Sequence, residues 1–234
     1  MAGAPGAALE SALLALLNAA LSRVSARGEG EAAVLAAVDS LDVASLQASA
    51  EAYAAALAAL APPNTQTAYV VDKTLNNFFV APLLAALLPD AKFLIAWRDP
   101  RDAALSMFWQ LFSGERAQLY TYDLAALGEY SALATLALRH LTLVLPQSRL
   151  RVAAYEETVR DLEGAMRASL SFLDLAWDDR TLSFAEAAGQ VDTASIAQVR
   201  KPLYNSSVGE WRRHEQYLRP LLEALDAHSA VYAI

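Results

Sequence analysis

Cysteine is absent from this 234-residue chain, and histidine occurs only three times. Without cysteine there is no disulfide framework, no thiolate zinc site and no cysteine nucleophile. The three histidines, His140, His214 and His228, lie far apart in the sequence, which argues against a histidine-rich metal site. We therefore expect a protein that needs no metal.

A net positive charge and a long apolar run are also missing. The chain carries 18 basic and 26 acidic residues, for a net charge of −8 at pH 7, whereas a general nucleic-acid binder has a basic surface. No run approaches the roughly 20 apolar residues of a membrane span. The first basic residue is Arg23, too late for the charged leading segment of a signal peptide. These absences predict a soluble, cytoplasmic protein that binds neither nucleic acid nor membrane.

Helical and strand patterns alternate along the rest of the chain. Residues 1–60 are alanine-rich, and the stripe of Leu46, Tyr53 and Leu57 predicts a one-sided helix. The prolines of "APPNTQT" end this pattern, and "YVVDK" at residues 69–73 is typical of a short strand. The further predicted elements are helix 77–88, strand 92–97, a helix capped by Asp99 with Pro100 at its first position, a long helix from Asp123 to near Pro146, the strand "LRVAAYE" and helix 159–173.

Strands separated by helices of this length imply βαβ units and a parallel sheet flanked by helices. The predicted fold class is therefore α/β. Ligands of such sheets bind beyond the carboxyl ends of the strands. Residues 188–211 have no sustained period and are predicted to form a long loop, a kind of segment that is often functional.

Arg98 stands at the carboxyl end of a predicted strand and directly before a capped helix. A guanidinium and free backbone amides therefore face the same crevice, which suits an anion such as phosphate. Ser106 follows about two helical turns later and can donate its hydroxyl to the same anion. The alternative is a surface ion pair between Arg98 and Asp99 or Asp102, which would contribute little.

Two further segments carry positive charge. Lys73 ends the preceding predicted strand, where a compact, mobile cation suits a migrating anionic group; a solvated turn lysine is the alternative. The predicted loop gathers basic and hydroxyl residues, which suggests a flap that closes over an anion rather than an ordinary exposed loop packed by Tyr204 and Trp211. These residues are Thr193, Ser195, Gln198, Arg200, Lys201, Ser206, Ser207, Arg212 and Arg213.

Four segments together resemble a known family. They are "VVDKTLNNF", "AKFLIAWRDPRDAALSMFWQLFSGERAQLYTYDLAALGEY", "LRVAAYEETV" and "TASIAQVRKPLYNSSVGEWRRHEQYL". In order and spacing they are similar to bacterial sulfotransferases often fused to tetratricopeptide repeats, relatives of the tyrosylprotein sulfotransferases. The resemblance runs from about residue 41 to residue 225. It implies a fold related to P-loop kinases and transfer of a sulfuryl group from 3′-phosphoadenosine 5′-phosphosulfate to a hydroxyl of a peptide tyrosine, a carbohydrate or a small molecule.

The resemblance also implies roles for single residues. Arg98 and Ser106 would hold the 3′-phosphate, Tyr155 would lie near the adenosine, and Lys73 would lie beside the 5′-phosphosulfate. Glu31, in a Gly-Glu pair, would be the general base. The remaining implied residues, which close over the nucleotide, are Ser195, Gln198, Arg200 and Lys201.

The sequence departs from the family at two places. "GAPGAALESALLALL" keeps Gly3, Ala4 and Pro5 of the phosphosulfate loop but has none of its arginine or hydroxyl residues, and Glu210 replaces a basic residue. The missing loop groups would weaken co-substrate binding by several kcal/mol, at roughly 1.5 to 3 for each charged hydrogen bond. We expect residues 1–40 to be an alanine-rich remnant of the loop region, and residues 41–234 to be a sulfotransferase-like domain lacking its first strand.

Two functions follow from this pattern. The first is an active sulfotransferase; the second is an impaired or non-catalytic protein or fragment of the same fold that serves in binding. A P-loop nucleoside kinase is disfavoured, because no Gly-x-x-x-x-Gly-Lys-Ser/Thr sequence occurs.

Overall fold

The computed structural model describes residues 43–59, 69–73, 77–110, 112, 118–186 and 206–228. They belong to two compact units, one within residues 1–89 and one within residues 90–234. The predicted N-terminal segment, residues 1–40, lies outside the described residues, so the domain division proposed from the sequence stays a prediction.

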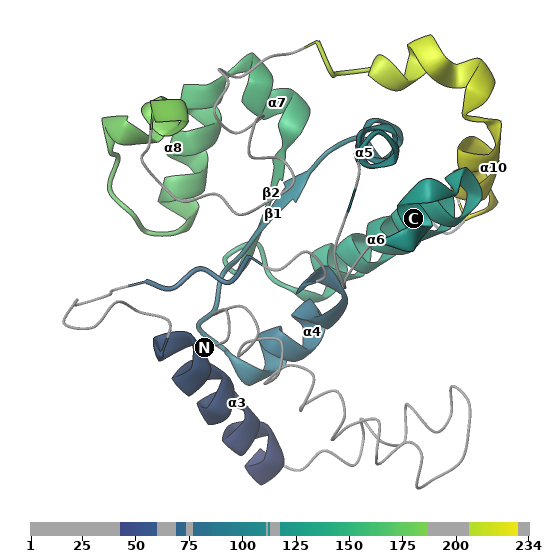
Figure 1. Ribbon diagram of the computed structural model, residues 1–234. Coiled ribbons are helices and arrows are strands. Elements are labelled where there is room, and N and C mark those ends of the chain that lie inside the picture. The colour runs from purple at the N-terminus through teal and green to yellow at the C-terminus, as the bar shows by residue number, and fades with distance from the viewer. Residues whose placement is uncertain are drawn as a thin grey trace, which may run out of the picture. The chain divides into compact units, whose positions relative to one another are not determined.

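Two helices dominate the described part of the first unit, α3 (Val43–Ala58) and α4 (Asn77–Leu87), and both confirm the sequence prediction (Figure 1). Tyr53, from the predicted apolar stripe, is only 2% exposed. Its hydroxyl donates a hydrogen bond to Asp72 Oδ2, which attaches residues 69–73 to α3. Burial and the neighbouring carboxylate both raise the pKa of Tyr53, so this hydroxyl stays a donor.

The strand predicted for residues 69–73 does not form. The chain there has no regular secondary structure, and Tyr69, Val70 and Val71 are exposed. A strand is stabilised by pairing its backbone with a neighbour. The described part of this unit contains no other strand. The prediction was wrong because residues 69–73 have no neighbouring strand there to pair with.

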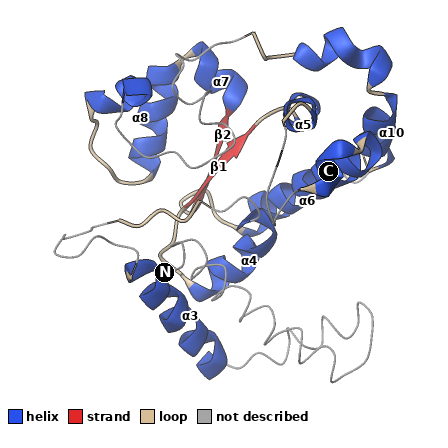
Figure 2. Cartoon of the chain, viewed as in Figure 1, coloured by secondary structure: helices blue, strands red, loops and turns tan. Residues whose placement is uncertain are grey.

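The second unit is built around two parallel strands, β1 (Phe93–Trp97) and β2 (Leu150–Ala154) (Figure 2). Their register pairs Phe93 with Leu150 and Trp97 with Ala154. The predicted parallel pairing is therefore confirmed, in a unit whose described residues are mostly helical. The second strand ends earlier than expected, because the residues after Ala154 enter a helix.

Aspartates begin three helices of this unit, as their side chains provide the acceptors that free helical amides need. Asp99 accepts from the amide of Arg101 and starts α5, with Pro100 in the first turn as predicted. Asp123 accepts from the amide of Ala126 and starts the predicted long helix. The helices of the unit are α5 (Pro100–Phe108), η1 (Leu119–Tyr122), α6 (Leu124–Val144), α7 (Tyr155–Arg160), α8 (Leu162–Phe172), η2 (Asp179–Glu186), η3 (Glu210–Tyr217) and α10 (Arg219–Ala227).

The single helix predicted for residues 159–173 is instead two helices. Asp161 separates α7 from α8 with an extended backbone, φ −143° and ψ 84°, and its side chain accepts from the amide of Gly164. An aspartate with this geometry ends one helix and caps the next, which is why the break falls here.

The core of the second unit lies between α5, α6 and α10. Leu127 of α6 and Leu221 of α10 are fully buried, and Leu105 of α5 and Trp211 of η3 join them. Figure 1 shows α10 lying along α6. Because Trp211 is part of this core, η3 is attached to the same packing that holds α5 in place.

Among the described helices, none combines the length and apolar content that crossing a membrane requires.

Candidate functional site

Arg98 directly follows the last residue of β1, and its side chain turns inward onto the protein. Its Nη2 donates to the carbonyl oxygen of Ser207 at 2.8 Å, and its guanidinium carbon lies 4.9 Å from the centre of the Tyr155 ring. An arginine over an aromatic face at this distance makes a favourable cation–π contact. The two contacts fix the guanidinium at the carboxyl end of the sheet.

The strand register explains why Arg98 and Tyr155 meet. Trp97 and Ala154 are paired across the parallel strands, and Arg98 and Tyr155 are the next residue on each side. Parallel strands end at the same edge, so these two side chains emerge together. The Tyr155 hydroxyl then lies 2.9 Å from the Ser207 hydroxyl, which closes a three-residue cluster of Arg98, Tyr155 and Ser207.

Part of the Arg98 guanidinium has no hydrogen-bond partner among the described residues. Its Nε is buried, yet it makes no hydrogen bond within the described part of the chain. A buried donor that lacks an acceptor costs free energy, and an anion bound beside it would remove that cost. The unsatisfied Nε of Arg98 is therefore a donor that suits an anionic ligand at this cluster.

The alternative of a surface ion pair at Arg98 is wrong. Asp99 pairs with Arg101, whose Nη2 is 2.5 Å from Asp99 Oδ2, and Asp102 accepts hydrogen bonds from backbone amides. Arg98 makes an ion pair with neither carboxylate in the described structure, so its charge is left for another partner.

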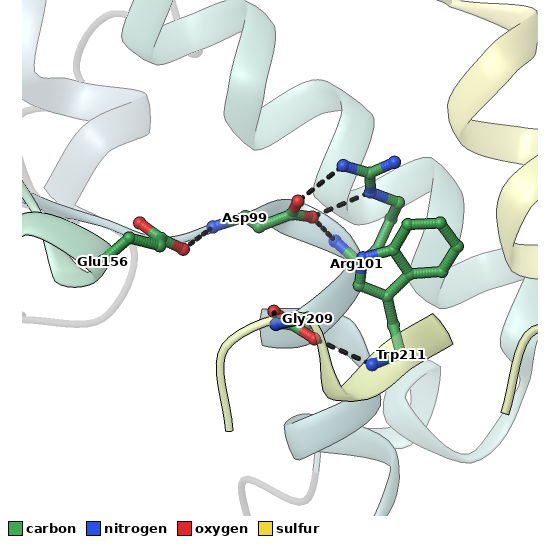
Figure 3. A network of polar contacts seen from close by, with 6 residues as sticks. Asp99, Arg101, Glu156, Gly209 and Trp211 are labelled. Atoms are coloured by element: carbon green, nitrogen blue, oxygen red, sulfur yellow. Dashed lines mark hydrogen bonds and ion pairs between the residues drawn. The ribbon is translucent and has the colours of Figure 1, made fainter. Parts of the chain in front are cut away.

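Asp99 joins the two strand ends through hydrogen bonds (Figure 3). Its amide donates to Glu156 Oε1 at 2.9 Å, and its carboxylate accepts from the amide and the side chain of Arg101. Burial works to raise the pKa of Asp99, but the Arg101 hydrogen bonds outweigh it and hold the pKa below the usual value. The same bonds raise the pKa of Arg101.

Asp102 connects α5 to the segment that carries Ser207. Asp102 is 2% exposed, and its carboxylate accepts from the amides of Gly209 at 2.6 Å and Trp211 at 2.9 Å. Figure 3 shows the bond that ends at the Trp211 amide, beside Gly209. The Arg101 guanidinium also lies 4.2 Å from the Trp211 ring centre, so the first turn of α5 holds this segment at two points.

Ser106 is half-buried on α5, two turns beyond Arg98, and no hydrogen bond joins the two side chains in the described structure. Its role at the 3′-phosphate stays a prediction. Lys73 is exposed and belongs to the first unit, and its role at the phosphosulfate likewise stays a prediction. The other predicted site residues lie outside the described residues: Glu31, Ser195, Gln198, Arg200 and Lys201.

Glu210 is matched by positive charge on its own helix. Its Oε2 is 3.0 Å from Arg213 Nη1, and its Oε1 is 3.6 Å from His214 Nε2. Arg212 instead places its guanidinium 5.0 Å from the Trp211 ring centre. Arg213, and not Arg212, therefore compensates the Glu210 carboxylate in the described structure.

Ser207, a member of the cluster, and Asp102, which holds the segment that carries Ser207, were given no role in the site from the sequence. Ser207 appeared only as one member of a loop rich in hydroxyl and basic residues, and Asp102 only as a candidate surface partner of Arg98. The available signal for Asp102 was weak, since an aspartate in the first turn of a helix is common on exposed surfaces. Its burial depends on contacts with residues more than 100 positions away.

Parallel strands with an arginine at their carboxyl end, before a capped helix, are typical of α/β proteins that bind anionic ligands. Comparison with known proteins gives the family: the sulfotransferase family matches residues 7–179, and the chain belongs to it. The resemblance recognised from the sequence motifs is thereby confirmed.

Two proteins are similar to this chain over part of their length. It is 33% identical over 157 residues to an uncharacterized protein of Aquifex aeolicus (strain VF5), which covers 67% of this chain and 20% of the relative. It is 27% identical over 138 residues to protein-tyrosine sulfotransferase 2 of Gallus gallus, which covers 56% of this chain and 37% of that protein. The chain thus spans well under half the length of these curated relatives.

Proposed function

We propose that this protein is a sulfotransferase that uses 3′-phosphoadenosine 5′-phosphosulfate and transfers its sulfuryl group to a hydroxyl acceptor. Membership of the sulfotransferase family supports the reaction class. The single observation that carries the site is Arg98, whose guanidinium is held by Tyr155 and Ser207 while its buried Nε finds no acceptor among the described residues.

In this proposal the cluster binds the 3′-phosphoadenosine end of the co-substrate. Arg98 would pair with the 3′-phosphate through the donors that are not bonded to Ser207, with Ser106 as a second donor. Tyr155 would hold the guanidinium in place and lie beside the adenosine.

The transferred group would be handled by residues outside this cluster. Sulfuryl transfer, like phosphoryl transfer, proceeds in line between two oxygens, so positioned cations supply much of the rate. Lys73 is proposed to stabilise the moving anionic group, Glu31 to accept the acceptor's proton, and the loop with Ser195, Gln198, Arg200 and Lys201 to close over the nucleotide. No metal has a place in this scheme.

The proposal includes a P-loop-kinase-like fold for residues 41–234 and a loop-region remnant in residues 1–40. The similarity to a protein-tyrosine sulfotransferase makes a peptide tyrosine one proposed acceptor, beside carbohydrate and small-molecule hydroxyls. Acceptor specificity depends on pocket contacts that family membership does not supply.

Calorimetry with adenosine 3′,5′-bisphosphate, the nucleotide product, tests the proposal. Wild type is expected to bind, and Arg98→Ala is expected to lose about 1.5 to 3 kcal/mol of binding free energy, the contribution of a charged hydrogen bond. Arg180→Ala is the matched control, because Arg180 pairs with Asp178 on the surface of the same unit. Equal affinities of wild type and Arg98→Ala would exclude Arg98 from the site.

The second candidate is an impaired or non-catalytic protein or fragment of this fold, which binds the nucleotide weakly or not at all and acts, if at all, in binding. It is favoured by the missing arginine and hydroxyl residues of the "GAPGAALESALLALL" segment. Fusion of a strand and a Pro-Arg-Ser-Gly-Thr loop to the N-terminus separates the two candidates. Sulfate transfer by the fusion but not by the chain alone would identify the chain as the impaired form, limited by this segment.

A further inference from the structure

Asp102 is a buried charge for which the roles above give no purpose. It lies in the first turn of α5 and is 2% exposed, and its two oxygens accept from the amides of Gly209 and Trp211. No ion pair involves it among the described residues. Burying a carboxylate is costly unless hydrogen bonds replace its water, so its position at this site requires an explanation.

The amides of Gly209 and Trp211 both point to the Asp102 carboxylate because of the backbone conformation at Gly209. Gly209 adopts φ +74°, a left-handed conformation that glycine enters without steric cost, and it immediately precedes η3. The amides of Gly209 and Trp211 therefore belong to the unbonded start of that helix. Asp102 supplies from α5 the cap that the local sequence of η3 does not provide, since the Gly209 position has no side chain.

Ser207 lies two residues before this anchor. Its carbonyl receives the Arg98 hydrogen bond, and its hydroxyl contacts Tyr155. Any displacement of Gly209 would therefore move the acceptor that orients the Arg98 guanidinium. Trp211 is fixed separately by core packing and by Arg101, so the Gly209 bond is the contact that sets the Ser207 side of the segment.

We propose that Asp102 is a positioning residue for nucleotide recognition. By holding Gly209 and Trp211, it places Ser207, and through Ser207 it aligns Arg98 for the 3′-phosphate. This inference rests on the proposed function, since it assigns Asp102 to the selection of nucleotides that carry a 3′-phosphate.

Asp102→Asn tests the inference with little change in shape, because asparagine keeps one carbonyl acceptor and loses the other. The control is Asp161→Asn, which alters an aspartate cap in the same unit, at α8. Calorimetry measures the affinities of both variants and wild type for adenosine 3′,5′-bisphosphate and for adenosine 5′-monophosphate. The readout is the ratio of the two affinities, which a merely destabilised protein would leave unchanged.

We expect wild type to prefer the bisphosphate, and Asp102→Asn to reduce that preference roughly tenfold, as for one weakened charged hydrogen bond. Asp161→Asn should keep the wild-type ratio. If Asp102→Asn also keeps it, the positioning role is refuted while the proposed function stands. If wild type binds neither nucleotide, the proposed function fails and takes the positioning role with it.

A second measurement on wild type covers the case in which the variant does not fold. Hydrogen exchange by NMR should show that the amides of Gly209 and Trp211 are protected, because both are bonded to a buried carboxylate. Exchange of these amides at the rate of an unstructured peptide would overturn the inference without any variant.

Discussion

Replacing Gly128 with alanine tests how closely α6 and α10 approach each other. A Cβ atom at this position would lie 2.7 Å from the Leu221 carbonyl oxygen and 2.7 Å from the Ala224 Cβ. It would also lie 3.2 Å from the Leu221 Cα, so the obstacle is largely backbone. A flexible side chain can move away, but backbone contacts yield only if the two helices separate.

The sign of the effect depends on two opposing magnitudes. Alanine inside a helix is favoured over glycine by about 1 kcal/mol. Ordinary contact begins near 3.4 Å, so restoring it needs a shift of about 3.4 − 2.7 = 0.7 Å between the helices. Overpacking of this kind costs about 1 to 3 kcal/mol. Because α10 closes the core around Leu221, we expect the upper end of that range and a net loss of about 1 to 2 kcal/mol.

Urea unfolding followed by circular dichroism measures the change in the free energy of unfolding. Glu129 is the next residue along α6 and is exposed, so the pair Glu129→Ala and Glu129→Gly measures the alanine–glycine difference without packing. We expect that pair to differ by about 1 kcal/mol in favour of alanine. If Gly128→Ala stabilises the protein by the same amount, the close approach of the helices is refuted.

Two further predictions concern the segment around the candidate site. Gly209→Ala should destabilise the protein by about 1 to 2 kcal/mol through its left-handed backbone, and Gly209→Asn by less, whereas equal urea midpoints for the two variants would contradict this. The ionised Asp99 is favoured in the fold, so its contribution is present above its usual pKa of 3.8 and is lost as the pH falls through its lower folded pKa. Asp99→Asn should therefore show a shallower loss of stability in urea titrations between about pH 5 and pH 2, and a loss as steep as that of wild type would show that Asp99 does not contribute.

Local sequence signals predicted α5 and α6 of the second unit, and α8 as part of a longer helix, but not α10 or the short helices η1, η2 and η3. Asp99 with Pro100, and Asp123 before an apolar run, carry the capping chemistry that starts a helix in any context. The two strands were also predicted, because short apolar runs between helices suit a parallel sheet. The strand at residues 69–73 was not a correct prediction, since its formation depends on a partner that local composition does not reveal.

At the candidate site, too, some features follow from the local sequence and others depend on distant segments. The sequence by itself determined that Arg98 stands at the carboxyl end of a strand before a capped helix, because these features depend on neighbours along the chain. It placed Tyr155 inside the next strand, which in the structure ends one residue earlier, at Ala154. Only the tertiary structure decided that Ser207 meets both side chains and that Asp102 is buried beneath the segment that carries it. Those contacts join residues 52 to 109 positions apart, and they exist because strand register and core packing bring distant segments together.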